Sequence, residues 1–107
     1  FFIIYKRKKE MTFQEIINQG KPVLVDFFAT WCGPCKTQAP ILEEVKQHLG
    51  DQVSIIKIDV DQNQAVASQY QVRSVPTLII FKNGQIRWRQ AGVFPVNELE
   101  RLLKENI

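Results

Sequence analysis

Three nearly unbroken apolar runs divide the chain, over residues 23–28, 53–58 and 77–81. Runs of this length, rich in Val, Ile and Phe, are typical of strands buried on both faces of a sheet. Residues with helical spacing separate the first run from the second. Such a crossover connection predicts that the first two strands are parallel.

Helical spacing also defines the remaining intervals. Thr12 and Glu15 have the spacing of a capping box, and the apolar positions that follow predict a short helix there. Further helices are expected over residues 35–49, with a bend at Pro40, over residues 63–70, and from Pro95 onward with leucines facing the sheet.

The dipeptide Asn83-Gly84 is the strongest short-range signal for a β-hairpin. It joins the third apolar run to an antiparallel partner over residues 86–90. Within this partner, Ile86 and Trp88 alternate with arginines, which predicts one buried face and one solvated face.

Both cysteines of the chain, Cys32 and Cys35, follow the first apolar run and open the long helix. Backbone N–H groups and the helix dipole stabilise negative charge at this position. A thiolate benefits, because a lowered thiol pKa makes cysteine a nucleophile near neutral pH. Two thiols three residues apart can also close a disulfide with each other. The pair therefore indicates a centre of dithiol–disulfide exchange.

Two other interpretations of the cysteines have less support. A zinc site would need further ligands, but the chain has no third cysteine and a single histidine, His48, so such a site could form only between chains. A purely structural disulfide would close a loop of two residues, which removes little entropy from the unfolded chain.

The chain resembles the thioredoxin family over about residues 13–107. The matching residues are Asp26, Trp31-Cys32-Gly33-Pro34-Cys35-Lys36, Pro40, Lys57, Asp59, Asp61, Val75-Pro76-Thr77, Gly84 and Gly92. The resemblance implies an α/β protein with the thioredoxin fold, in which helices sandwich a central mixed β-sheet of parallel strands plus an antiparallel hairpin.

The resemblance also implies a protein-disulfide reductase, a thiol–disulfide oxidoreductase that works by dithiol exchange. Cys32 would attack the target and Cys35 would resolve the mixed disulfide, leaving the redox-active disulfide Cys32–Cys35. The peptide bond before Pro76 would be cis. The expected substrate-binding surface is flat and apolar, and comprises Trp31, Gly33, Pro34, Val75, Pro76, Gly92 and Val93.

Asp26 and Lys57 each place a charge inside an apolar run, where an unpaired charge is costly. Together they suggest a pair on neighbouring parallel strands, although Lys57 alone could extend its amine to the surface. Burial should raise the pKa of Asp26 while Lys57 lowers it. In the family, the residue matching Asp26 takes part in proton transfer to the resolving cysteine, with Lys57 matching its partner.

The chain of 107 residues is long enough for one domain, and its net charge is +3. Four positive charges lie within residues 6–9, and the remainder is near neutral, so nucleic-acid binding has little support. The sequence contains no glycine-rich phosphate loop, so no bound cofactor is expected, and no metal site is expected either. The resemblance implies a cytoplasmic monomer that acts on disulfide-containing proteins and is recycled by an NADPH-dependent thioredoxin reductase.

Two alternative functions remain open at this point. One is an oxidant or isomerase in an oxidising compartment, although Gly33-Pro34 between the cysteines resembles the reducing members of the family. The other is a structural subunit in which the cysteines are incidental.

Residues 1–10 stand apart from the predicted domain, residues 11–107. The apolar residues 1–5 are too few for a membrane span or a signal-peptide core. They could form an edge strand, as in the family. Alternatively, they belong to an upstream extension, with Met11 as the natural start.

Overall fold

The computed structural model describes residues 2–3 and 11–107 of the chain. Five strands form one mixed sheet in the order β1-β3-β2-β4-β5. The strands are β1 (Phe2–Ile3), β2 (Val23–Phe28), β3 (Ser54–Asp59), β4 (Thr77–Lys82) and β5 (Gln85–Ala91). β1 and β2 run parallel to β3, whereas β4 is antiparallel to both of its neighbours, β2 and β5. The predicted mixed sheet is therefore confirmed.

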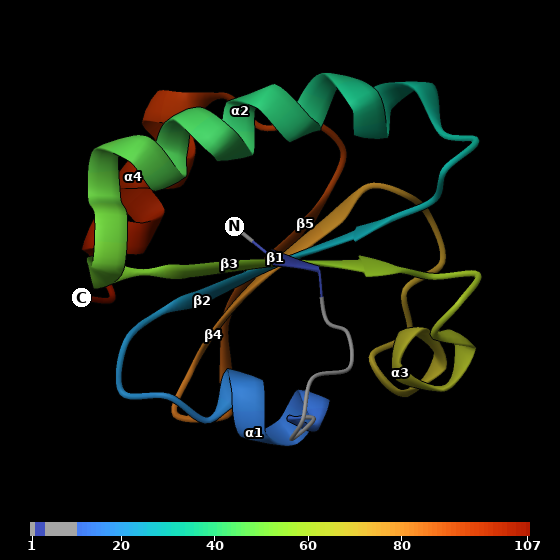
Figure 1. The fold of residues 1–107 in the computed structure, drawn as a ribbon, viewed down its shortest axis with the longest axis horizontal. Coiled ribbons are helices and arrows are strands. Elements are labelled where there is room, and N and C mark those ends of the chain that lie inside the picture. The colour runs from blue at the N-terminus through green and yellow to red at the C-terminus, as the bar shows by residue number, and fades with distance from the viewer. Residues whose placement is uncertain (1, 4–10) are drawn as a thin grey trace.

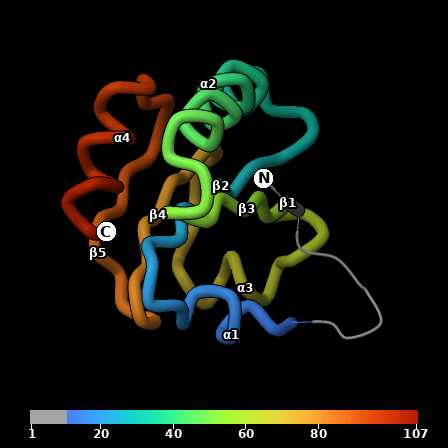
Figure 2. Tube along the Cα trace, turned by 60° about the vertical axis from the view of Figure 1, so that its left-hand side comes forward, coloured from blue at the N-terminus to red at the C-terminus, as the bar shows by residue number. Residues whose placement is uncertain are grey.

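Helices cover both faces of this sheet. They are α1 (Phe13–Ile17), α2 (Gly33–Leu49), α3 (Gln64–Gln69) and α4 (Val96–Lys104), and a 3₁₀ turn, η1 (Gly50–Gln52), follows α2. Figure 1 shows α2 and α4 on one face of the sheet and α1 and α3 on the other, and the turned view in Figure 2 agrees. This is the thioredoxin fold that the sequence predicts.

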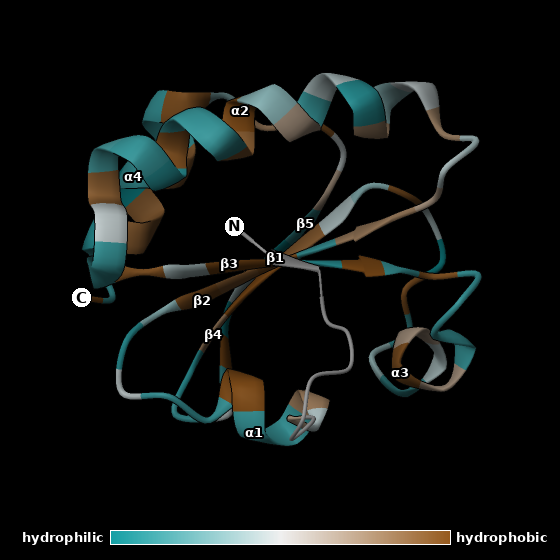
Figure 3. Ribbon diagram, viewed as in Figure 1, coloured by the Kyte–Doolittle hydropathy of each residue, from teal (hydrophilic) through white to brown (hydrophobic). Residues whose placement is uncertain are grey.

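The alternation of side chains along the central strands builds one core on each face of the sheet. In β2, Leu24 packs into the cluster beneath α2 and α4, whereas Val25 and Phe27 pack into the cluster on the α1 side. All three side chains are fully buried. Figure 3 shows α1 turning its apolar residues toward the sheet. The central strands are apolar throughout because both of their faces are covered.

Several local predictions are confirmed. Thr12 caps α1 in a capping box with Glu15. Asn83 and Gly84 have φ of +53° and +79°, the positive values that a tight hairpin turn requires. α2 continues through Pro40 to Leu49, and the bend at that proline stays a prediction.

The predicted alternation along β5 is wrong for Ile86. The register shifts between Ile80 and Phe81, so that Trp88 is opposite Ile80 while Ile86 is opposite Phe81. Neighbouring residues of a strand point to opposite faces, and the shift therefore turns Ile86 away from the face that Trp88 shares. As a result, Ile86 is 47% exposed, whereas Trp88 packs against the cluster beneath α4.

At the start of the chain, Phe2 and Ile3 pair with Ile56 and Lys57 of β3. Residue 1 and residues 4–10 lie outside the described residues. The division of the chain into residues 1–10 and a domain of residues 11–107 therefore stays a prediction.

Candidate active site

Cys32 and Cys35 form a disulfide at the amino end of α2. Their Cα atoms are 5.3 Å apart. Cys32 is the N-cap residue of the helix, and its Sγ accepts a hydrogen bond of 3.1 Å from the backbone N–H of Cys35. A sulfur in this position faces a backbone N–H that has no partner within the helix, and it also faces the positive end of the helix dipole. Both stabilise a thiolate.

The two cysteines are buried to the same extent, with 4% of each residue exposed. Burial therefore does not distinguish the two cysteines in the disulfide form. Ala29, Phe28, Val60 and Val75 pack around the pair and shield it. One feature that distinguishes the two cysteines in this structure is the capping hydrogen bond to Cys32 Sγ.

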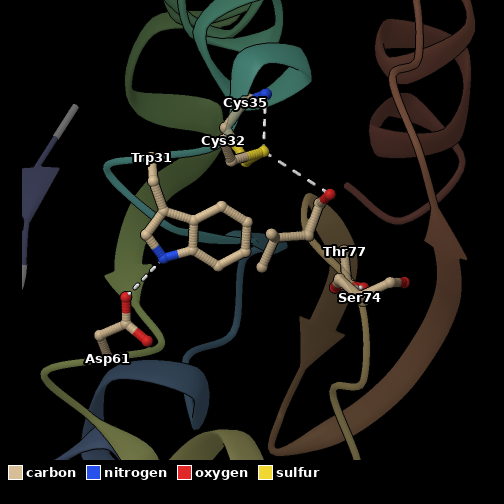
Figure 4. Close-up of a disulfide and its surroundings, with 7 residues drawn as sticks. Trp31, Cys32, Cys35, Asp61, Ser74 and Thr77 are labelled. Atoms are coloured by element: carbon tan, nitrogen blue, oxygen red, sulfur yellow. Dashed lines mark hydrogen bonds between the residues drawn. A yellow bond between two sulfur atoms is a disulfide. The ribbon is translucent and has the colours of Figure 1, made fainter.

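The loop before β4 lies directly against the disulfide. The peptide bond between Val75 and Pro76 is cis, as the resemblance implied. The Val75 carbonyl oxygen is 3.6 Å from Cys32 Sγ (Figure 4). Thr77 braces the loop, because its hydroxyl donates a 2.7 Å hydrogen bond to the Ser74 carbonyl oxygen. Pro76 is buried, whereas Val75 is partly exposed.

Trp31 flanks the disulfide on the surface. Its side chain is 70% exposed, yet its indole N–H donates a 2.9 Å hydrogen bond to a carboxylate oxygen of Asp61 (Figure 4). The Asp59 side chain in turn accepts a hydrogen bond from the Asp61 backbone N–H. The indole is thereby held in place while its apolar surface stays open. Gly33 and Pro34, also predicted for the substrate surface, are exposed beside it.

The loop after β5 completes the surface. The Gly92 N–H donates a 2.9 Å hydrogen bond to the Pro76 carbonyl oxygen, which ties this loop to the loop before β4. Gly92 has φ of +100°, a conformation that favours glycine. Val93, the next residue, is 38% exposed. Sequence adjacency and these contacts therefore link six of the predicted residues to Cys32 and Cys35, and Val93 follows Gly92 directly.

A hollow of about 160 Å³ beside Trp31 makes the surface less flat than expected. It is lined by Trp31, Val60, Val72, Arg73, Ser74 and Val75. Four of these residues, Val60 and Val72–Ser74, were not predicted as part of the site. Residues 72–74 precede the Val-Pro-Thr motif directly, so their place in the sequence could have indicated them.

Asp26 lies in β2 beneath α2, on the same face of the sheet as Leu24. It is fully buried, and neither carboxylate oxygen has a hydrogen-bond partner among the described residues. Burial raises the pKa of this carboxyl to about 6, and the positive charge of Lys57 opposes part of the rise. Asp26 and Lys57 are register partners on neighbouring strands. The Lys57 ammonium nitrogen lies 4.5 Å from the centroid of the Phe28 ring.

No cluster of three or more His, Cys, Asp and Glu that could hold a metal ion occurs within residues 2–3 and 11–107. None of the helices described is long and apolar enough to cross a membrane. The site can instead exchange a disulfide for two thiols, because both sulfurs belong to one vicinal pair at a helix amino end. The fold and the site together define a thiol–disulfide oxidoreductase.

Comparison with known proteins agrees with this class. The thioredoxin family model matches residues 4–105. Thioredoxin Y of rice, described as chloroplastic, is 46% identical over 95 residues, which are 88% of this chain but 56% of that protein. A thioredoxin-like protein of Synechocystis is 48% identical over 92% of this chain and 94% of its own length.

Among solved structures, a mutant thioredoxin from Halobacterium salinarum superposes with a TM-score of 0.83 at 32% identity, over 98% of this chain and 88% of that one. The chain belongs to the thioredoxin family.

Proposed function

We propose that the reduced form of this chain reduces disulfide bonds in protein substrates, with Cys32 as the attacking thiolate and Cys35 as the resolving thiol. The observation that carries this assignment is the hydrogen bond from the Cys35 N–H to Cys32 Sγ at the start of α2. It favours negative charge on the sulfur of Cys32.

In the first step, the Cys32 thiolate attacks one sulfur of the target disulfide. The target S–S bond breaks, and its other sulfur leaves as a thiolate that takes up a proton. In the second step, Cys35 loses its proton and attacks Cys32 Sγ, which releases the first target sulfur as a thiol. Two electrons pass to the target, and the chain is left with the Cys32–Cys35 disulfide.

Asp26 is our candidate for the group that accepts the Cys35 proton, with Lys57 as its electrostatic partner. Its pKa of about 6 supports this role, because a base whose pKa lies near the working pH is ionised yet still takes up a proton readily. Its position beneath α2, on the same face of the sheet as the cysteine pair, gives the same support.

Substrate peptide would bind across the surface formed by the seven residues around the disulfide. Trp31 and Val93 offer apolar contacts, and an extended peptide would add hydrogen bonds to the backbone of the loops. A surface of this kind suits many different target sequences, because backbone hydrogen bonds do not depend on the side chains of the target.

For turnover, the disulfide must be reduced again, and we expect an NADPH-dependent thioredoxin reductase to supply the electrons. We further expect a monomer that works in a reducing compartment such as the cytoplasm. The family alone does not fix the compartment, since the rice relative is described as chloroplastic.

The test is reduction of insulin by dithiothreitol. We expect the chain to accelerate insulin reduction. In a second experiment, each variant is reduced, freed of dithiothreitol and mixed with insulin, and we expect Cys35→Ser to accumulate as a mixed disulfide because it can attack but has no second thiol to release the target. Cys32→Ser should neither accelerate the reaction nor accumulate. Non-reducing gel electrophoresis and mass spectrometry identify the trapped species.

Three outcomes would contradict the proposal in different ways. If the wild type does not accelerate the reaction, the chain is not a reductase of protein disulfides. If only Cys32→Ser traps insulin, the roles of the two cysteines are reversed. If neither variant traps it, the pair does not act by exchange.

A further inference from the structure

Gln38 is a fully buried polar residue on the helix that carries the cysteines. It follows Cys35 by three positions, close to one turn of α2, and none of its surface is exposed. A buried amide destabilises the fold unless its donor and its acceptor both find partners. What Gln38 contacts therefore accounts for its presence among the apolar residues on the inner side of α2.

Both halves of the Gln38 amide bind the backbone of Phe94, which lies 56 positions later. The side-chain Nε2 donates a 3.1 Å hydrogen bond to the Phe94 carbonyl oxygen, and the Phe94 N–H donates a 2.8 Å hydrogen bond to Gln38 Oε1. The amide pairs with both backbone groups of one residue, as a neighbouring strand would. Removal of the Gln38 amide would leave the N–H and the carbonyl oxygen of Phe94 without these partners.

This pairing fixes one end of the loop that presents Val93. Gly92 is tied at the other end by its hydrogen bond to the Pro76 carbonyl oxygen. The Phe94 ring packs edge-on against Trp88, with the ring centroids 5.0 Å apart. Val93 lies between these two anchors and is the residue of the three whose side chain is most open to solvent.

We propose that Gln38 is a positioning residue that locks the Gly92–Phe94 loop to the active-site helix and thereby sets the affinity for protein disulfides. The inference rests on the proposed function, because it assigns the Val93 loop to substrate binding. Gln38 touches neither the substrate nor the sulfurs in this scheme. Its loss should therefore weaken the binding of a protein target while leaving the exchange chemistry intact.

The principal test is Gln38→Met, which keeps the length of the side chain and removes both hydrogen bonds. We expect its KM for insulin to rise roughly tenfold, a change consistent with two lost hydrogen bonds. Its kcat with insulin should stay within about twofold of the wild type. The rate with the small disulfide 5,5′-dithiobis(2-nitrobenzoic acid), which needs no protein-binding loop, should also stay within about twofold.

Gln19→Met is the matched control. Gln19 also uses its amide nitrogen in a hydrogen bond, of 2.7 Å to the Ile16 carbonyl oxygen, but it lies just after α1. The same chemical change at this position should leave the KM and kcat for insulin and the rate with the small disulfide unaltered. The control therefore separates loss of an amide in general from loss of the contact with Phe94.

The Gln38→Glu variant tests the pairing through the pH dependence of KM, which a merely structural role of Gln38 would not alter. A protonated carboxyl can accept from the Phe94 N–H and donate to the Phe94 carbonyl oxygen, as the amide does, whereas the ionised form can only accept. Burial raises the pKa of a carboxyl in such a place. The KM of this variant, divided by the wild-type KM at the same pH, should be near one at pH 5 and rise toward pH 8.

Hydrogen exchange at the Phe94 amide tests the contact independently of catalysis. Protection in the wild type and faster exchange in Gln38→Met are expected. If exchange becomes faster but the insulin KM stays at the wild-type value, the inference is overturned and Gln38 is an ordinary core residue. Equal loss of rate with insulin and with the small disulfide would also overturn it. A wild type that fails to reduce insulin would instead overturn the proposed function.

Discussion

At the scale of single residues, Asp26 combines complete burial with a carboxylate that has no hydrogen-bond partner among the described residues. A buried charge without hydrogen bonds destabilises the folded state. The raised pKa of about 6 expresses this cost, since the folded chain holds the proton over a range where the unfolded chain has released it. A residue that lowers stability and stays in the core points to a role in the reaction.

The effect of Asp26 on stability depends on pH in a defined direction. Below pH 3.8 the carboxyl is protonated in both the folded and the unfolded state, and it lowers stability little. The stability that this protonated carboxyl allows is lost as the pH rises through about 6, because the unfolded chain releases its proton before the folded chain does. Above this range the ionised group costs at most about 3 kcal/mol, which is the rise in pKa multiplied by about 1.4 kcal/mol per unit. Asp26→Asn should therefore increase the free energy of unfolding at pH 7 by up to about 3 kcal/mol.

Urea denaturation at pH 4, 5.5 and 7 measures this difference, which should approach zero at pH 4. The same variant should reduce insulin more slowly than the wild type near neutral pH, because the proton acceptor is missing. Asp51→Asn, at an exposed position after α2, is the control and should change neither quantity. Rates for Asp26→Asn that match the wild type between pH 6 and 8 would leave Asp26 with no part in proton transfer.

At the scale of elements, contacts between distant segments hold the loops of the site. One example is Arg89 of β5, whose guanidinium donates hydrogen bonds to the carbonyl oxygens of Tyr70 and Gln71 just after α3. Gln71 has a positive φ of +54°, which is unfavourable for a residue other than glycine. Arg89 thus stabilises the turn from which the chain proceeds to the loop before β4.

We expect Arg89→Lys to loosen this turn, because a lysine cannot span two carbonyl oxygens as the forked guanidinium does. Hydrogen exchange measured by mass spectrometry should show several-fold faster exchange over residues 70–75. Arg87→Lys, the same substitution at an exposed neighbour on β5, should leave exchange in that segment unchanged. Equal exchange in the two variants would mean that Arg89 does not hold the turn.

The sequence predicted those parts of the structure that local patterns determine. The apolar runs indicated the central strands, Asn83-Gly84 indicated the hairpin, and the cysteine pair indicated the chemistry. Contacts across long stretches of chain were not predictable in this way. Gln38 looks like a solvated helix position until Phe94 is known to lie beside it, and the exposure of Ile86 depends on a register shift that alternation alone does not reveal.

At the scale of the whole molecule, three links join the active-site helix to two distant loops. Cys32 lies against Val75, Pro76 accepts a hydrogen bond from Gly92, and Phe94 returns to Gln38 on the helix. The segments involved lie within residues 32–38, 75–76 and 92–94, and none of them includes residues 1–10. β1 lies at the edge of the sheet beside β3, and neither of these two strands is among these segments.

Removal of residues 1–10 should therefore leave insulin reduction intact. It should lower the melting temperature, on the order of 5 °C, because the pairing of β1 with β3 is lost. Differential scanning calorimetry of the full and shortened chains measures the shift. An unchanged melting temperature would favour Met11 as the functional start, and a loss of activity at a temperature where the shortened chain is folded would give the segment a role in the reaction.

The register shift in β5 also bears on how the protein behaves when it is concentrated. A strand at the border of a sheet can pair with the same strand of another molecule, and such pairing begins aggregation. An irregular ladder and charged side chains both hinder it. β5 has the irregularity opposite Ile80 and Phe81 and carries exposed Arg87 and Arg89. Molecules that meet along this border are therefore poorly matched for pairing, and we expect the protein to resist aggregation when it is concentrated.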